Sequence, residues 1–445
     1  MQGGGEIMKE KTRRKSALAL TAALALSLLA GCGTPSSDGR GESFVSDSSG
    51  AEEQTAYVRV PEMFSSLSEG AADFAFDFSE GAKSIAKEGE NFAVSPLSVY
   101  MALSLAAECA AGNTKEEILS AMGVSYKTLT AEFGDLYRSL NVGFDEGELS
   151  LTNSVWVNEG EQVFDERITA LKDSYFCPLY TADFISDNEN ANRAVREFVK
   201  EQTNGLIDKD FQLDTETVFA LINTLYFKDV WSAYGPIGRT EEEYAFAAAD
   251  GSTRRSQFLV GGYSLGRMYE GEGFTSFYSE TENGYRLHFL LPADGYTAED
   301  IFTAENLKAV SEADYGGTDE ENKIRYYTRC IFPEFSASFD GDVKGLLQEG
   351  FGVGDFFDRY KCDVTPFIVR PGENVYCERV VHVTQFNVDE EGIEGAAVTV
   401  EVGVGDSAPE YEEIYSTLVV NRSFGFFLSD PNGVTLFSGI VRDIS

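Results

Sequence analysis

The chain is 445 residues long and carries 35 Lys and Arg against 74 Asp and Glu, a formal charge of −39. Its 43% hydrophobic and 13% aromatic residues can build a sizeable core, so the composition excludes global disorder. The acidic excess argues against nucleic-acid binding, because phosphate contacts need clustered Lys and Arg. At about 100–200 residues per domain, the length allows two to four domains or one unusually large one.

The N-terminus has the pattern of a bacterial lipoprotein signal. A cluster of basic residues precedes an apolar stretch over residues 17–30, which is too short to span a bilayer comfortably. The stretch ends in Leu-Ala-Gly-Cys at Cys32, which is similar to a lipobox, the motif in which the cysteine is acylated and becomes the new N-terminus. A plain secretion signal or a signal anchor is the alternative.

We therefore expect residues 1–31 to be a signal peptide and residues 32–58, rich in Gly, Ser, Asp and Glu, to be a flexible tether. The mature protein would then lie outside the cell, attached to the bacterial membrane only through the lipid on Cys32. The remaining residues, 59–445, are expected to form the folded domain.

Cysteine and histidine usage indicates neither a metal site nor a disulfide framework. Beyond Cys32 the cysteines are odd in number and scattered without a CxxC pair. They are Cys109, Cys177, Cys330, Cys362 and Cys377, and the two histidines are His288 and His382. We expect most of these thiols to be small buried side chains. A bridge between Cys362 and Cys377 is conceivable, and no metal or cofactor is implied.

Taken in chain order, hydrophobic periodicity predicts alternating helices and strands. It predicts helices over residues 71–85, 97–111, 115–122, 165–175, 191–202 and 298–307. Strands are predicted at 91–94, 151–157, 218–227, 286–291, 323–332 and 424–428. Thr114 and Glu117 have the spacing of a capping box for the third helix. With no internal repeat after the tether, the pattern predicts one large α+β domain.

One segment does not fit this pattern. Between Glu390 and Pro409 the chain has no Lys or Arg and consists mostly of small, β-branched and acidic residues. Such residues can enter a crowded sheet, yet the four glycines among them make a poor permanent strand. The segment is either an ordinary edge strand with a loop or a strand that joins its sheet only in some states.

Seven landmarks, in the right order from about Pro61 to Asp443, resemble the serpin family. They are residues 91–99 with 112–114, Asn153 with 182–184, Asn192 with Thr203, Gly205 and Ile207, residues 221–231, residues 289–292, residues 333–335, and residues 421–424 with 436–439. Three departures, Cys109, Ser423 and Gly425, stand where the family commonly has glycine, proline and a large apolar residue. These departures concern packing rather than mechanism.

The resemblance implies the serpin fold, with three β-sheets, about nine helices and an exposed reactive-centre loop, here within residues 390–420. It implies a protease inhibitor rather than an enzyme. A serine protease, or a cysteine protease, attacks the loop and forms a covalent acyl-enzyme. The loop then inserts into the main sheet and traps the protease. We expect a monomer, and a non-inhibitory member that binds a ligand or partner is the alternative.

The same resemblance assigns residues to the moving parts. The hinge of the loop comprises Glu390, Gly392, Ile393, Glu394, Gly395, Ala396, Ala397, Val398 and Thr399. Ser95, Ser98, Asn223 and His382 match the polar cluster beneath the sheet opening, called the shutter, and Trp231 matches the breach, where the loop first enters. Strand alternation would turn Ile393 and every second residue after it inward, which includes the carboxylate of Glu401.

The position of the cleaved bond stays open. Counting from Gly392 selects Asp406 and Ser407, whereas counting back from Asn421 gives a bond near Glu412, because the loop is longer than usual on its C-terminal side. Val404, Ala408, Tyr411 and Glu413 are therefore alternatives. No Lys or Arg lies between Glu390 and Asn421, so a trypsin-like target is not expected. The acidity of the same segment predicts a target with a basic rim.

Overall fold

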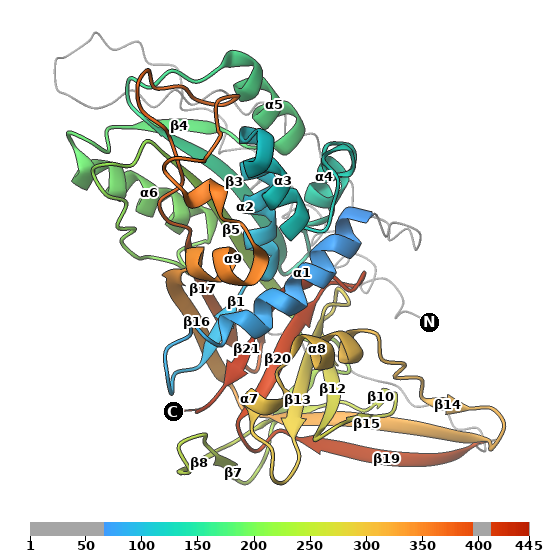
Figure 1. Cartoon of the computed structure of the whole chain (residues 1–445). Coiled ribbons are helices and arrows are strands. Elements are labelled where there is room, and N and C mark those ends of the chain that lie inside the picture. The colour runs from blue at the N-terminus through green and yellow to red at the C-terminus, as the bar shows by residue number, and fades with distance from the viewer. Residues whose placement is uncertain (1–65, 395–410, 445) are drawn as a thin grey trace, which may run out of the picture. The chain divides into compact units, whose positions relative to one another are not determined.

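The computed structural model describes residues 66–394 and 411–444, which lie within one compact unit (Figure 1). The described residues form nine α-helices, the number expected. They are α1 (Ser66–Ala82), α2 (Pro96–Cys109), α3 (Gly112–Ala121), α4 (Tyr126–Ser139), α5 (Asp165–Tyr175), α6 (Asn188–Gln202), α7 (Ala298–Ile301), α8 (Ala304–Ser311) and α9 (Lys344–Phe351). None of the helices in this described part has the length and apolar character that a membrane span requires.

The main sheet has the strand order β16-β17-β18-β5-β3-β2, and β4 pairs with the same edge of β3 as β2. Its strands are β2 (Val142–Gly143), β3 (Glu148–Asn158), β4 (Leu179–Ala182), β5 (Phe219–Val230), β16 (Phe335–Asp342), β17 (Val381–Val388) and β18 (Gly392–Ile393). The long central strands are rich in branched and aromatic residues, which favour a pleated, buried surface.

Two further sheets complete the three that were predicted. The second sheet has the order β1-β21-β20-β13-β12-β11, and the third runs β10-β15-β9-β6 with β14 and β19 also paired to β15. Their bounds are β1 (Phe92–Val94), β6 (Pro236–Arg239), β9 (Leu259–Gly261), β10 (Ser264–Leu265), β11 (Tyr269–Gly271), β12 (Phe274–Glu280), β13 (Arg286–Pro292), β14 (Thr318–Asp319), β15 (Ile324–Phe332), β19 (Glu412–Val419), β20 (Phe424–Ser429) and β21 (Thr435–Val441). A small hairpin pairs β7 (Tyr244–Ala247) with β8 (Thr253–Ser256).

Helix α2 lies between the main and second sheets and forms the centre of the core. Its residues are almost all buried, and it contacts β5 on one side and β21 on another. The sequence starts the helix firmly, because Pro96 stands at its first position and the Ser95 side chain accepts a hydrogen bond from the Ser98 N–H. The position of α2 directly under β5 becomes important for the site.

Two local predictions were wrong. The predicted capping box does not form, since α3 already begins at Gly112 and has no side-chain cap. Thr114 Oγ1 instead accepts from the Asp363 N–H at 3.0 Å, and Glu117 accepts from the N–H groups of Gly354 and Asp355 at 2.9 and 2.7 Å. The helix predicted over 298–307 is two helices, because α7 ends at Ile301 and the Thr303 side chain caps a new helix, α8.

The five cysteines of the described residues are free thiols. Four of these cysteines are buried, and Cys377 is half-buried. Burial raises the pKa of both Cys362 and Cys377 to about 12, so these thiols stay protonated and behave as apolar side chains.

Candidate functional site: an opening in the main sheet

The main sheet is open between β5 and β17. A cavity of about 720 Å³ lies there, lined by residues 217–224 from the β5 side and residues 374–381 from the β17 side. Its floor consists of apolar side chains of α2, among them Val99, Leu103 and Ala106. Backbone groups along both walls could therefore accept a further strand, whose inner face would meet an apolar surface.

The first residues of the predicted hinge already occupy one end of this opening. Ile393 pairs with Val388 on β17 and with Asp229 on β5, so β18 is antiparallel to both neighbours. The Ile393 side chain is only 1% exposed. The backbones approach so closely that a Cβ on Gly392 would lie 2.2 Å from the Asp229 carbonyl oxygen, and only glycine fits there.

Trp231 anchors the chain where it turns toward the opening. Its side chain is buried, packs edge-on against Phe332, and donates from Nε1 to the Asp389 carbonyl at 2.9 Å. Glu390 next to it accepts from Arg239 at 2.5 Å, and the same guanidinium binds Glu334. These contacts hold the segment just before the hinge at one place on the sheet.

Glu394 lies where the described chain leaves the sheet. It has a left-handed backbone with φ of 56°, and its N–H donates to the Asn387 carbonyl at 3.3 Å. Partial burial raises the pKa of its carboxyl to about 7, against the opposing effects of the Tyr226 hydroxyl and Lys228. The other hinge and bond candidates lie outside the described residues, namely Gly395, Ala396, Ala397, Val398, Thr399, Val404, Asp406, Ser407 and Ala408.

The four predicted shutter residues come together under the opening. His382 Nε2 accepts from the Ser95 N–H at 3.0 Å, and Ser98 Oγ donates to Asn223 Oδ1 at 2.5 Å. Asn223 belongs to β5 and His382 to β17, so the cluster touches both walls of the opening and the start of α2. One chain of hydrogen bonds thus connects the parts that must separate if the sheet opens further.

One further residue, Asn153, joins this cluster and was not predicted to do so. Asn153 on β3 faces Asn223 in register and accepts from its side-chain amide at 2.6 Å. The sequence offers Asn153 only as a family landmark, because its place in the cluster depends on the register of β3 against β5.

A family model described as Serpin (serine protease inhibitor) matches residues 69–444. The chain belongs to the serpin family. Serpins as a family are protease inhibitors rather than catalytic enzymes. The residues that match the family model include all three sheets and both walls of the opening between β5 and β17.

Individual relatives agree with this assignment. Serpin B11 of Mus musculus is 24% identical over 377 residues, which cover 79% of this chain and 92% of the relative. The native-state crystal structure of tengpin, a thermophilic serpin, superposes with a TM-score of 0.71 at 23% identity and covers 88% of this chain and 96% of tengpin. Thyroxine-binding globulin in complex with thyroxine gives 0.69 at 20% identity and covers 85% and 99%. The predicted serpin fold is thereby confirmed.

In this serpin, Tyr411 and Glu413 are the reactive-bond candidates within the described residues, and both lie on the third sheet instead of at the opening. The Tyr411 hydroxyl donates to Glu320 at 2.7 Å, and the Tyr411 ring centroid lies 4.3 Å from the Arg325 guanidinium. Glu412 immediately after it starts β19, which pairs in parallel with β15. The extra residues on the C-terminal side of the loop therefore belong at least in part to a strand.

His288 is separate from this serpin's opening. It is buried on β13, where it stacks on Phe427 with ring centroids 4.3 Å apart and shares a hydrogen bond with Ser429. Burial lowers its pKa to about 3, and the side chain is a neutral part of the core.

Proposed function

We propose that the protein is a protease inhibitor that acts as a suicide substrate. In this proposal the target cleaves the reactive loop and forms an acyl-enzyme, and insertion of the loop between β5 and β17 traps it before hydrolysis. The single observation that carries the proposal is β18, a two-residue strand of the hinge already seated at one end of an otherwise open cavity.

The register of β18 supports this path. Because β18 is antiparallel to both neighbours, each further residue of the loop would face the residue one earlier on β5 and on β17. Continued in this way, Thr399 would come opposite Asn223 and His382. Its hydroxyl would then reach the shutter, where polar partners are present.

Insertion would also supply the driving force. About 14 residues would gain strand pairing, each hydrogen bond contributing roughly 0.5–1.5 kcal/mol, which amounts to on the order of 10 kcal/mol. This is comparable to the stability of a whole domain, so the uncleaved protein would be metastable and kept in place by a barrier.

We infer that the cleaved bond lies at Asp406 and Ser407 or at the nearby Val404 and Ala408. Tyr411 and Glu413 are disfavoured, because Glu412 and Glu413 are already paired in β19. No Lys or Arg stands in the loop, so elastase-like, chymotrypsin-like and acid-directed proteases are the targets to test.

A non-inhibitory role is the second candidate, and one residue favours it. In the continued register, Glu401 would point inward between Leu221 and Val380, over the apolar floor of the cavity. A buried carboxylate without a partner opposes insertion. Thyroxine-binding globulin, a structural neighbour of this chain, has the same fold and binds a small ligand, thyroxine.

We also propose that the serpin domain is displayed outside the cell, anchored through lipid on Cys32. The support is the basic and apolar signal that ends in the lipobox-like motif. Labelling of expressing cells with a fatty-acid analogue would mark the wild-type protein and leave the Cys32→Ala variant unmarked. Equal labelling of both would contradict the lipid anchor.

The inhibitory proposal is tested by incubating the protein with pancreatic elastase, chymotrypsin, a glutamyl endopeptidase and, as a control, trypsin. We expect an SDS-stable complex with at least one of the first three and cleavage without trapping, or no reaction, with trypsin. Mass spectrometry of the released C-terminal peptide would identify the bond. Absence of any stable complex, together with no rise in thermal stability after loop cleavage, would refute the proposal.

A further inference from the structure

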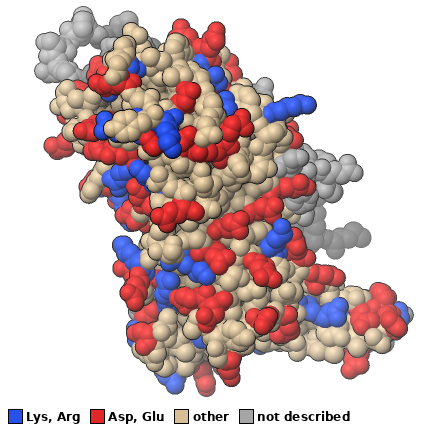
Figure 2. All heavy atoms as spheres, viewed as in Figure 1, with Lys and Arg blue, Asp and Glu red and all other residues tan. Residues whose placement is uncertain are grey.

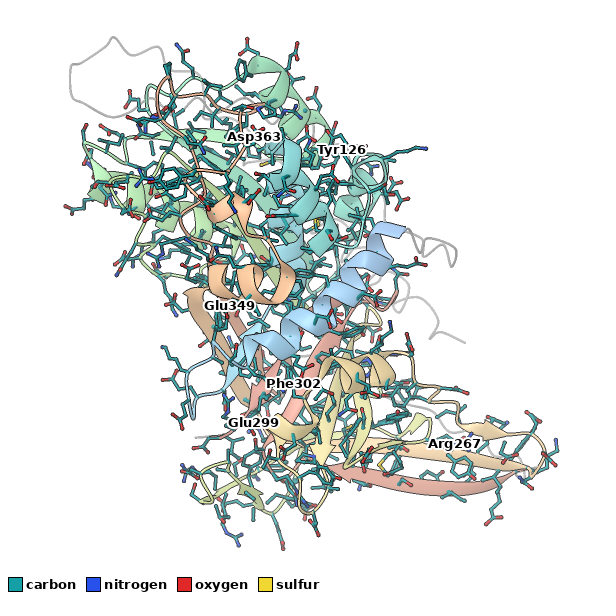
Figure 3. All side chains as sticks on the ribbon, in the orientation of Figure 1. Tyr126, Arg267, Glu299, Phe302, Glu349 and Asp363 are labelled. Atoms are coloured by element: carbon teal, nitrogen blue, oxygen red, sulfur yellow. The ribbon has the colours of Figure 1, made fainter. Side chains whose placement is uncertain are left out.

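The third sheet extends into an arm that the inhibitory mechanism does not use. The arm comprises residues 318–329 and 411–417, from β14, β15 and β19, and projects beyond β12 and β13 with β14 at its far end (Figure 1). Arg267, labelled in Figure 3, lies on it with its guanidinium 4.9 Å from the Tyr326 ring. Its residues 411–417 come directly after the loop segment that holds the favoured bonds.

One face of the arm is built from tyrosine and arginine. We call it the tyrosine face, and it consists of Tyr263, Arg325, Tyr327, Arg329, Tyr411 and Tyr415. Tyr327 and Tyr415 are paired in register and stack with centroids 5.2 Å apart, and Tyr263 meets Tyr415 edge-on at 5.0 Å. Arg329 lies 4.7 Å from the Tyr263 ring. These contacts fix the rings in a continuous row.

This face is directed away from the body of the protein. On β15 the residues that alternate with it, Thr328 and Cys330, are buried, and Cys330 contacts the Tyr278 carbonyl on β12. None of the six residues of the tyrosine face is buried: Tyr415 is exposed and the other five are half-buried. Tyr415 is 54% exposed although it packs between two other tyrosines. The rings therefore do not serve the core.

Rigid, exposed tyrosines with neighbouring arginines are typical of protein-binding surfaces. A Tyr ring offers apolar area and a hydroxyl at low cost in conformational entropy, and Tyr and Arg are enriched among residues that dominate binding energy. Charges on the face are partly balanced, because Glu413 lies in register with Arg325 and accepts from the Tyr415 hydroxyl at 2.8 Å. Contact through the rings, more than through charge, is the expected mode.

The length of the chain indicates what would cover this face. A fully extended chain spans at most about 3.6 Å per residue. The five residues from Asp406 to Tyr411 can therefore cover no more than roughly 18 Å, and the seven from Val404 no more than roughly 25 Å. A small globular domain is already about 30 Å across. A protease that holds any of the favoured bonds is therefore within reach of the arm.

We propose that the tyrosine face binds the body of the protease that attacks the loop, so that target choice depends on this surface as well as on the cleaved bond. The inference rests on the proposed inhibitory function. The partner would be an endopeptidase with an apolar or aromatic patch. This patch would lie beside the active-site cleft, on the side where the leaving peptide binds.

The test compares wild type with the Tyr327→Ala/Tyr415→Ala double variant against each protease of the panel that wild type traps. Tyr296→Ala is the matched control, because Tyr296 is 45% exposed and lies in the loop before α7 instead of on the arm. We expect the rate of complex formation to fall at least about tenfold in the double variant, with an unchanged stoichiometry of inhibition and an equal loss at low and high salt. The control should match wild type.

A second measurement separates binding from trapping. The form of each panel protease whose catalytic serine is replaced by alanine should bind wild type more tightly than the double variant by a similar factor, and the single variant Tyr263→Ala, in the turn beside the strands, should show a smaller loss. Binding and rates within twofold of wild type would overturn the proposal. If no protease is trapped, the inhibitory function fails, while binding of the inactive proteases still decides whether this face contacts them.

Discussion

At the scale of single residues, His382 of the shutter stabilises the fold because its imidazole is neutral and can accept a hydrogen bond. His382 is fully enclosed beneath the sheet, its Nε2 accepts from the Ser95 N–H, and Phe78 and Phe339 pack around its ring. Burial lowers its pKa to about 4 from an ordinary value near 6.5. A proton on Nε2 would remove the acceptor that links β17 to α2. The link between β17 and the start of α2 therefore requires an uncharged imidazole.

This pKa shift predicts a stability that depends on pH. Since the folded pKa lies below the unfolded one, the contribution of His382 is complete above about pH 6.5 and is lost as the pH falls toward 4, with about 2 kcal/mol gone near pH 5. Between pH 7 and pH 5, acidification should therefore lower the midpoint of urea unfolding more in wild type than in His382→Gln, whose side-chain oxygen can still accept from Ser95.

His288→Gln is the control for this measurement, because His288 is equally buried and lies apart from the opening. His288→Gln should remove only the part of the pH-dependent stability that comes from the titration of His288 itself. A His382→Gln protein that loses as much stability on acidification as wild type would show that the shutter histidine is not the titrating group.

At the scale of elements, β18 decides whether the loop can start to insert. Its two residues fit between β5 and β17 only because Gly392 has no side chain, and Ile393 is buried as a result. Gly392→Ala should displace β18 and expose Ile393. The cleaved loop would then insert more slowly, and more inhibitor should be consumed as plain substrate for each protease trapped, by several-fold in the stoichiometry of inhibition.

Gly345→Ala is a matched control, since a Cβ at this position in α9 meets no atom within 4 Å. It should inhibit like wild type. If Gly392→Ala also keeps the wild-type stoichiometry, the seat of β18 does not limit insertion.

The same elements show where reading the sequence succeeds and where it fails. Helix α5 begins and ends at the predicted residues, because its apolar periodicity and its acidic first turn are local signals. The true roles of Thr114 and Glu117 depend on backbone groups more than 200 residues away. Likewise, β18 and β19 are strands because β17 and β15 offer them edges, and no local pattern reports a distant edge.

The candidate site was predictable to a similar degree. Family landmarks identified Ser95, Ser98, Asn223 and His382, which the fold indeed brings together. They could not reveal that a two-residue strand already occupies the opening or that Asn153 joins the cluster. Both depend on strand register, which the sequence fixes only through the tertiary packing of the sheet.

At the scale of the whole molecule, the acidity is widely distributed but unevenly compensated. Acidic side chains are spread over the face shown in Figure 2, and the formal charge is −39. Part of the loop's own charge meets basic groups, because Glu390 binds Arg239 and Glu413 lies beside Arg325. Glu401, Asp406 and Glu410 have no Lys or Arg near them in sequence. The sequence around the favoured bonds thus carries acidic residues and no basic one.

If the target carries a basic rim, the rate of complex formation should fall as salt is added, because screening weakens the attraction that steers the encounter. Glu410→Gln should lower the rate at low salt and flatten its salt dependence. Glu413→Gln, in contrast, should change the salt dependence little, since its charge is already opposed by Arg325 in the next strand. Second-order rate constants over a series of salt concentrations measure both effects. A rate that does not vary with salt would mean that the charge serves solubility and that recognition rests on the bond and the tyrosine face.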